Sequence, residues 1–198
     1  MAKLQSLIIA FQWQLVVFNY ISFFFITQIS YALSYDYVKT MDPKFLELPE
    51  QKLTHFHFYF HDTYGGSNPT VVQIVPPASN TSTTMFGLVS MMDDPLTEGP
   101  NLSSRLIGKA QGFYGSSSQE EVSFILAMNC VFTEERYNGS TITIFGRDPI
   151  LSEVREMPVI GGTGVFRFAS GFAQASTYSV NLTTGDAIVE YNVYVLHY

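Results

Sequence analysis

Apolar and polar residues alternate along most of the chain after residue 52, in short runs separated by turn residues. Alternation with a period of two predicts strands, and outside residues 1–32 no stretch keeps a helical period. The predicted strands cover the segments 53–62, 70–75, 85–92, 107–114, 122–133, 140–146, 165–177 and 187–197. This pattern favours an all-β fold, an eight-stranded antiparallel β-barrel, and strand count alone leaves a two-sheet sandwich open.

Turn residues separate these runs and fix the expected connections. Asn138-Gly139 between two apolar runs predicts a hairpin, because both residues tolerate positive φ. Asp94-Pro95 is interpreted as a strand breaker. The run 161–164, Gly-Gly-Thr-Gly, is interpreted as a tight turn between strands, since the Lys-Ser/Thr pair and helix of a phosphate loop do not follow it.

The first predicted strand ends in a carboxylate on an aromatic face. Alternation puts Asp62 on the same face as Phe56, Phe58 and Phe60, whereas His55, His57, Tyr59 and His61 share the opposite face. An acid on an apolar face is costly to bury unless it has a partner or a task, so Asp62 is a candidate catalytic or binding acid. A simple strand-ending turn residue is the equal alternative.

Small residues are expected to open one wall of the barrel for a ligand. Gly108, Ala110 and Gly112 share a face with Tyr114, and around residue 170 one face carries several alanines. On the same parity argument Phe166, Phe168 and Phe172 share the other face of the segment 165–177. A barrel of about eight strands has room for one small ligand.

The N-terminus has the features of a targeting segment. Lys3 precedes a long apolar run, and Ser30-Tyr31-Ala32 resembles a cleavage site, so residues 1–32 are predicted to be a signal peptide and 33–52 an irregular lead-in. An uncleaved membrane anchor is the alternative. Four sequons agree with a secreted, extracellular protein: Asn80, Asn101, Asn138 and Asn181. Cys130 is the only cysteine and lies in an apolar run, which predicts a buried, inert thiol.

Charge narrows the class of partner. The formal net charge is −7 and the pI is near 4.9. A chain this acidic has no basic patch to neutralise phosphates, which argues against nucleic acid. Lys and Arg are also too sparse for an anionic membrane surface. An apolar small molecule is the partner that the composition favours.

Further candidates for chemistry lie later in the chain. Asp148 follows a predicted strand, and Arg155 comes seven residues later. If Asp62 and Asp148 line one cavity, apolar surroundings would raise their pKa values toward those of general acids, with Arg155 or Tyr114 bonding a phenolic oxygen. The plainer alternatives are a turn-capping role for Asp148 before Pro149, a surface ion pair for Arg155, and ordinary packing for Tyr114.

The histidines also raise the question of metal. Three of them lie on one face of the segment 53–62, so a metal site is geometrically conceivable. That face is opposite Asp62 and would point outward from a barrel. No metal and no cofactor is therefore predicted.

Several ordered motifs closely resemble the plant dirigent proteins. They include residues 58–62 (Phe-Tyr-Phe-His-Asp), 92–100 (Met-Asp-Asp-Pro-Leu-Thr-Glu-Gly-Pro), 108–114 (Gly-Lys-Ala-Gln-Gly-Phe-Tyr), 154–158 (Val-Arg-Glu-Met-Pro) and 190–195 (Glu-Tyr-Asn-Val-Tyr-Val). The resemblance spans nearly all of residues 50–198, so residues 53–198 are identified as a dirigent β-barrel domain. It implies an eight-stranded barrel related to allene oxide cyclase, a homotrimer, and secretion to the apoplast.

The resemblance also implies a function. Dirigent proteins bind phenolic radicals or quinone methides, and the best known orient monolignol radicals that a separate oxidase, such as a laccase or peroxidase, produces. Stereoselective coupling in lignan-type phenylpropanoid biosynthesis is therefore the first expectation. A pterocarpan synthase-type lyase that dehydrates an isoflavanol is the alternative, and a phenolic carrier or defence protein is the weaker one. The family motifs carry catalytic roles to Asp62, Asp148 and Arg155, and substrate contacts to Tyr114 and Thr177.

The chain departs from the lignan-forming members at several positions. Those members generally have a cysteine pair, whereas this chain has Cys130 alone. Gly115 stands shortly after Gly-Phe-Tyr, where they have a second tyrosine, and Ser170 replaces their arginine. The ending, residues 193–198, is similar to the subgroup that includes the pterocarpan synthases.

Overall fold

The computed structural model describes residues 2–32 and 37–198, which divide into two units at residues 47 and 48. The first unit contains helix α1 (Ala2–Ala32) and a 3-10 turn, η1 (Pro43–Leu46). Within α1, the stretch Gln5–Phe25 is long and apolar enough to cross a membrane, a property that secretion signals share. The signal peptide over 1–32 stays a prediction. Of the lead-in, 33–36 lie outside the described residues.

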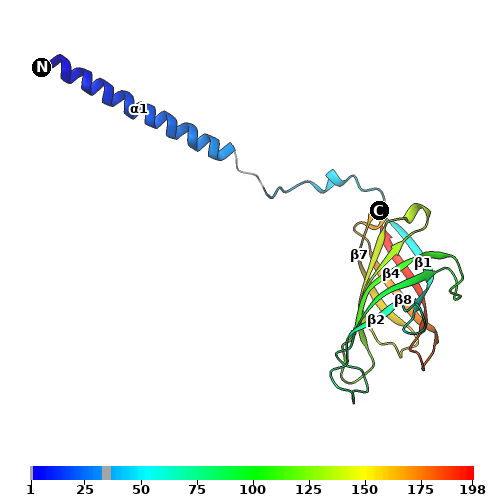
Figure 1. The fold of residues 1–198 in the computed structure, drawn as a ribbon. Helices are drawn as coiled ribbons and strands as arrows, with labels where there is room; N and C mark the ends of the chain where they lie inside the picture. The colour runs from blue at the N-terminus through cyan, green and yellow to red at the C-terminus, as the bar shows by residue number, and fades with distance from the viewer. Residues whose placement is uncertain (1, 33–36) are drawn as a thin grey trace. The chain divides into compact units, whose positions relative to one another are not determined.

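Residues 48–198 form the second unit, and all of it is described (Figure 1). Its strands are β1 (Lys52–Asp62), β2 (Val71–Val75), β3 (Val89–Thr97), β4 (Leu106–Ser116), β5 (Phe124–Phe132), β6 (Thr141–Asp148), β7 (Arg155–Thr163), β8 (Ser170–Val180) and β9 (Ala187–His197). Two further 3-10 turns are η2 (Glu135–Tyr137) and η3 (Gly164–Phe166). From β3 to β9 each strand pairs antiparallel with the next one along the chain.

The sheet closes on itself, so the predicted barrel is confirmed and the sandwich is excluded. β1 pairs with β9 over its whole length, from Lys52 opposite His197 to Asp62 opposite Ala187. On its other side β1 meets β3 at only two positions, Tyr59 opposite Thr97 and Phe60 opposite Leu96. These pairs complete a ring of eight strands, and β2 adds to the edge of β3 as a ninth.

The predicted number of barrel strands was right, but the predicted set was wrong. The segment 70–75 was counted as a barrel strand, whereas β2 is the extra strand beside β3. The strand β7 was not predicted at all. Its inward residues Arg155, Met157 and Val159 are buried and alternate with Glu156 and Pro158. An arginine on the inner face and a proline on the outer one conceal the period of two.

The strand β3 also runs further than its sequence indicates. It was predicted over 85–92 and observed over Val89–Thr97, through the supposed breaker Asp94-Pro95. Along this edge β3 pairs with β2 as far as Met92 and with β1 only from Leu96. Pro95 lies in the gap between these two ladders, where its missing N–H removes no strand hydrogen bond.

The segment before β8 was placed in the wrong conformation. Residues 161–163 continue β7 and 164–166 form η3, so the run Gly-Gly-Thr-Gly is not a turn between strands. Phe168 has a positive φ of 62°. The period of two therefore breaks before Ser170, and Phe166 is buried while Phe168 is exposed, contrary to the prediction that they share a face.

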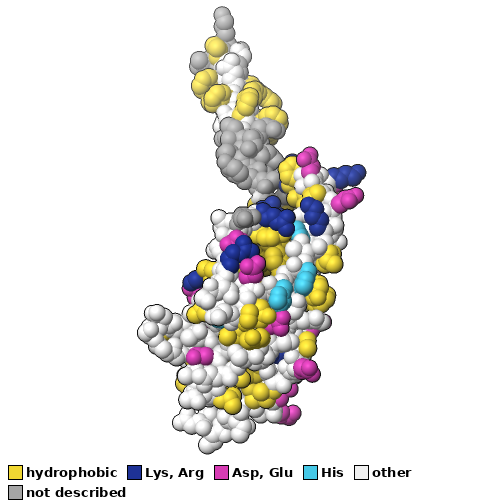
Figure 2. All heavy atoms as spheres, turned by 90° about the vertical axis from the view of Figure 1, so that its right-hand side faces the viewer, with side chains coloured by type: hydrophobic (Ala, Val, Ile, Leu, Met, Phe, Trp, Pro, Cys, Tyr) yellow, Lys and Arg dark blue, Asp and Glu magenta, His cyan; other side chains and the backbone are white. Residues whose placement is uncertain are grey.

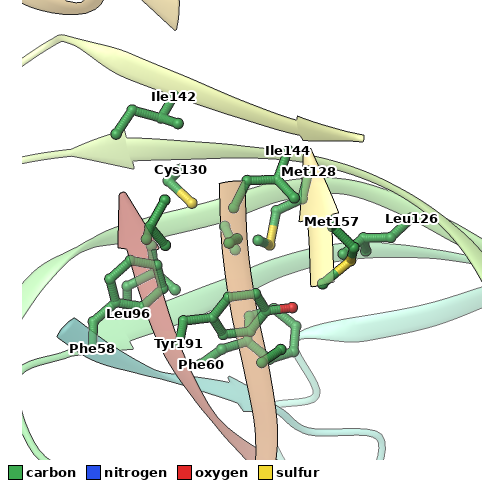
Figure 3. Close-up of a cluster of buried hydrophobic side chains, with 14 of the residues drawn as sticks. Phe58, Phe60, Leu96, Leu126, Met128, Cys130, Ile142, Ile144, Met157 and Tyr191 are labelled. Atoms are coloured by element: carbon green, nitrogen blue, oxygen red, sulfur yellow. The ribbon is translucent and has the colours of Figure 1, made fainter. Parts of the chain in front are cut away.

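The barrel interior is filled largely by aromatic and thioether side chains. Figure 3 shows Phe58, Phe60 and Tyr191 from the adjacent strands β1 and β9 in the same cluster as Met128 and Met157. The rings of Phe58 and Tyr191 stack with centroids 5.5 Å apart. Cys130 lies in the same core, and burial raises the pKa of its thiol to about 12, so the predicted inert thiol is confirmed.

Each of the three histidines on the outward face of β1 has a contact partner of its own. His55 stacks on Tyr194, with ring centroids 4.5 Å apart, and His57 Nε2 lies 2.6 Å from Glu190 Oε1. His61 is buried and pairs with the Thr97 hydroxyl at 2.6 Å. Figure 2 shows histidine side chains beside apolar ones on one face of the barrel. This face contributes to surface contacts and not to the cavity.

The small residues of β4 have a different role from the predicted one. A Cβ at Gly112 would lie 1.9 Å from the Ala127 carbonyl oxygen, and one at Gly108 would lie 2.3 Å from that of Val131. These glycines let the backbone of β5 approach β4 closely. They support the curvature of the barrel wall and do not widen the ligand space.

We expect Gly112→Ala to destabilise the barrel by about 3 kcal/mol, because the added methyl group meets backbone that cannot move aside. For a domain of this size the loss corresponds to a fall in Tm of roughly 6–12 °C. Gly161→Ala is the matched control, since a Cβ there has no heavy atom within 4 Å. Thermal unfolding of both variants checks this, and equal Tm values would show that β5 adjusts freely.

Candidate functional site

A cavity of about 520 Å³ opens at one end of the barrel. Its walls come from β1, β2, β4, β5, β6, β7, β8 and β9 and from the loops that follow β1, β2, β6 and β8. All five predicted site residues line it: Asp62, Tyr114, Asp148, Arg155 and Thr177. The remaining lining is mainly apolar, with Phe60, Leu88, Phe124, Leu126, Ile150, Val180, Val189 and Tyr191. The site is therefore an apolar chamber with a few polar groups.

The first polar group centres on Asp62. The Tyr114 hydroxyl lies 3.1 Å from Asp62 Oδ2 and 2.6 Å from the Tyr64 hydroxyl, which in turn lies 2.9 Å from Ser90 Oγ. The Tyr114 hydroxyl has one hydrogen and two acceptors within reach, so it donates either to Asp62 Oδ2 or to the Tyr64 oxygen.

Burial determines the protonation of Asp62. It raises the pKa of this carboxyl to about 7, although the hydrogen bond from Tyr114 acts in the opposite direction, and the negative charge of Asp186 raises it further. The pKa of Tyr114 is raised by burial and by the neighbouring Asp62, so this phenol stays protonated. Asp62 is thus a carboxylic acid that can donate a proton near neutral pH.

The second polar group joins Asp148 to Arg155. Arg155 Nε lies 2.7 Å from Asp148 Oδ1, and its Nη1 donates to the Thr177 hydroxyl at 2.7 Å. The side chains of Arg155 and Asp148 are only 2% and 11% exposed. Burial raises the pKa of Asp148, and the arginine lowers it. This group is a charged pair in a largely dry wall, suited to bonding a polar oxygen of a ligand.

The plainer interpretations of two residues are wrong. Arg155 is not a surface residue paired with Glu153 or Glu156, because it points inward from the first position of β7. Asp148 is not a turn cap; it is the buried last residue of β6 and pairs with Arg155. The ring closure of the sheet brings these two residues into the same chamber as Asp62.

Sequence reasoning missed several members of the site. Neither Tyr64 nor Ser90 was singled out as a site residue. Asp186 Oδ1 accepts hydrogen bonds from the backbone N–H groups of Tyr64 and Gly65, at 2.8 and 3.0 Å, and so holds the turn that carries Tyr64. No sequence pattern links residues so far apart.

One predicted sequon lies at the cavity. Asn80, Asn101, Asn138 and Asn181 are all exposed. Asn181 also lines the cavity, and its side chain accepts a hydrogen bond from the Thr183 N–H at 3.0 Å. Glycosylation at all four positions stays a prediction, and a glycan on Asn181 would lie beside the opening.

A closed antiparallel barrel with acids in an apolar chamber defines a class of small-molecule binding barrel. The family profile "Dirigent-like protein" matches residues 53–196. The chain belongs to the dirigent protein family.

Individual relatives agree with this assignment. The chain is 51% identical over 164 residues to pterocarpan synthase 1 of Glycyrrhiza echinata, covering 82% of this chain and 87% of the relative. It is 53% identical over 147 residues to dirigent protein 21 of Arabidopsis thaliana, covering 74% and 78%. The solved structure of the pterocarpan synthase dirigent protein GePTS1 matches with a TM-score of 0.76 and 50% identity, over 81% of this chain and 99% of that one.

Proposed function

We propose that this dirigent protein is a lyase that dehydrates an isoflavanol-like phenolic alcohol and closes the resulting quinone methide stereoselectively. The observation that carries the proposal is Asp62, a buried acid whose pKa is raised to about 7 inside an apolar chamber. Eliminating a hydroxyl group needs a proton donor, whereas coupling of two radicals needs orientation alone. Similarity to two pterocarpan synthases supports the same reaction class.

The proposed step assigns a role to each polar group. Asp62 protonates the leaving hydroxyl, which departs as water and leaves a quinone methide that still carries the proton on its phenolic oxygen. A phenolic oxygen of the same molecule then attacks the electrophilic carbon and gives up its proton. The Asp148–Arg155 pair bonds a polar oxygen of the substrate and sets which face is attacked. The apolar walls hold the rings in that geometry and exclude competing water.

Stereoselective coupling of phenoxy radicals is the second candidate. The chamber presents hydrogen-bonding groups at two places, Tyr64 with Tyr114 and Asp148 with Arg155, which suits two phenolic ends. In that function a separate oxidase supplies the radicals and the barrel only orients them. Lignan-type coupling was the first expectation from the sequence and stays a prediction.

Location and assembly belong to the proposal as well. We expect a protein secreted to the apoplast after loss of residues 1–32, and a homotrimer that uses outer strand faces. The exposed aromatic residues Phe172 and Tyr178 on β8 support such an interface. A phenolic carrier or defence role requires no turnover and remains the weakest alternative.

In the deciding experiment the full chain is expressed, and the secreted protein is purified and incubated with a racemic isoflavanol and no oxidase, followed by chiral chromatography. Loss of substrate to one pterocarpan enantiomer supports the lyase. Absence of conversion over hours contradicts it. Addition of an oxidase and a monolignol then tests the second candidate, for which an enantiomeric excess of coupled product is the expected result.

A further inference from the structure

A third carboxyl is more deeply buried than the two that line the cavity. Asp94 is an inward residue of β3 with 0% exposure. The one donor near its carboxyl oxygens in the described part of the chain is the Thr70 hydroxyl, whose weak hydrogen bond lowers the pKa of Asp94; the same hydroxyl also lies 3.5 Å from the His61 carbonyl oxygen. A buried carboxylate with one weak donor is costly, so this group calls for a proton or a role.

Asp94 and Asp62 lie on the same face of the sheet, just beyond the end of the β1–β3 ladder. Phe60 of β1 and Leu96 of β3 form the last pair of that ladder. Asp62 lies two residues after Phe60, and Asp94 lies two residues before Leu96, so both acids keep the inward parity of this pair. Asp62 Oδ1 is also buried and unpartnered. The charge of Asp62 acts on Asp94 where β1 and β3 separate.

Among the described residues, no cation inside the barrel is left unpaired to compensate for the charge of the two acids. The titratable and charged groups around them are the phenols Tyr64, Tyr114 and Tyr191, the Asp148–Arg155 pair, Asp186, and on the outer face Asp93 with Lys109. Arg155 is already paired with Asp148, and Lys109 Nζ lies 2.6 Å from Asp93 Oδ2. Burial first, and then the charge of Asp62, raise the pKa of Asp94 to about 8.

We propose that Asp62 and Asp94 form a proton-sharing carboxyl pair, in which Asp94 is a positioning residue that keeps a proton available to Asp62. Two neighbouring acids in an apolar environment do not both ionise easily, so the last proton of the pair is held over a wider pH range than a single carboxyl would hold it. Asp94 does not line the cavity and so acts through Asp62.

The pair completes the proton balance of the proposed elimination, and in this respect it rests on the proposed function. The proton that Asp62 gives to the leaving hydroxyl departs in water. The phenolic proton released on ring closure returns to the pair. The Asp62–Asp94 pair therefore has the same charge at the end of each cycle as at its start, and no external acid is consumed.

Infrared spectroscopy of the protonated carboxyl C=O stretch, recorded against pH, tests the pair without any substrate. We expect wild type to lose its protonated-carboxyl signal in two steps at near-neutral to alkaline pH. In Asp62→Asn the remaining Asp94 step should move down by roughly one pH unit or more, because the like charge is gone. Asp148→Asn, which removes a carboxyl elsewhere in the chamber, should leave the upper step in place. An upper step within about 0.2 units of wild type in Asp62→Asn overturns the proposal.

The pH–rate profile supplies a second readout that a merely structural role would not move. Isoflavanol turnover by Asp94→Asn should decline at lower pH than that of wild type, since no second carboxyl retains a proton for Asp62. An unchanged profile overturns the proposal. If Asp94→Asn does not fold, the infrared comparison with Asp62→Asn still decides. If the titrations of Asp62 and Asp94 are coupled but no isoflavanol is turned over, the carboxyl pair is supported and the lyase is rejected. If isoflavanol is turned over but the two titrations are independent, the lyase is supported and the pair is rejected.

Discussion

Asp62→Asn is expected to lower isoflavanol turnover at least about 100-fold, the contribution typical of a general acid. Asparagine has nearly the same shape and no proton to give, so ligand binding and barrel stability should remain. The matched control is Asp93→Asn, the same chemical change on the outer face of β3, where Asp93 pairs with Lys109. Turnover of this control should equal that of wild type. An equal loss of turnover in both variants would show that Asp62 is not the proton donor.

The same residue makes a distinct prediction about pH. Turnover that needs protonated Asp62 is complete at low pH and declines as pH rises through about 7, the raised pKa of this carboxyl. The hydrogen bond from Tyr114 lowers that pKa. In Tyr114→Phe the pKa should rise, so the declining limb should move to higher pH. A limb that moves to lower pH would contradict the hydrogen-bonded arrangement described here.

Arg155→Met is expected to destabilise the folded barrel by about 3–5 kcal/mol, because it leaves the Asp148 charge buried without its partner. Removing the arginine also removes the charge that lowers the pKa of Asp148. Asp148 then takes up a proton more readily, so the loss should be smaller at pH 5 than at pH 8. Urea unfolding at both pH values measures it.

A double variant separates charge from packing. Arg155→Met combined with Asp148→Asn removes both charges and should recover most of the stability that the single change loses. Such a recovery would indicate that the Asp148–Arg155 ion pair serves ligand binding and adds little to the stability of the fold. If the double variant is as unstable as Arg155→Met alone, the arginine stabilises the barrel through its packing and its bond to Thr177, and the ion pair contributes little.

The period of two favoured a barrel, left a two-sheet sandwich open, and predicted the inward position of Asp62. It failed where function placed polar residues inward. Arg155 on the inner face concealed β7, and Asp94 next to Pro95 looked like the end of a strand. Contacts between strands, such as that of Asp148 with Arg155, depend on register, which the local pattern does not specify.

The family motifs led to residues that line the cavity but not to the groups behind them. Tyr64 lies in a Gly-rich turn that alternation does not orient, and its position depends on Asp186, more than 100 residues away in the chain. Ser90 looked like an ordinary small polar residue until the pairing of β3 placed it beside Tyr64. The positions of Tyr64 and Ser90 in the site follow from contacts between segments that are far apart in the chain, and the pattern of a single sequence does not reveal such contacts.

The pairing of the first barrel strand with the last has a consequence for biosynthesis. The strands β3 to β9 form hairpin by hairpin as the chain grows, since each pairs with its predecessor. β1 has only two paired positions with β3 and waits for the eleven it makes with β9. In Figure 1 these two strands, cyan and red, lie side by side. The chamber therefore cannot close until the C-terminal residues have left the ribosome, and a chain that ends early keeps β1 as an unpaired, aggregation-prone edge.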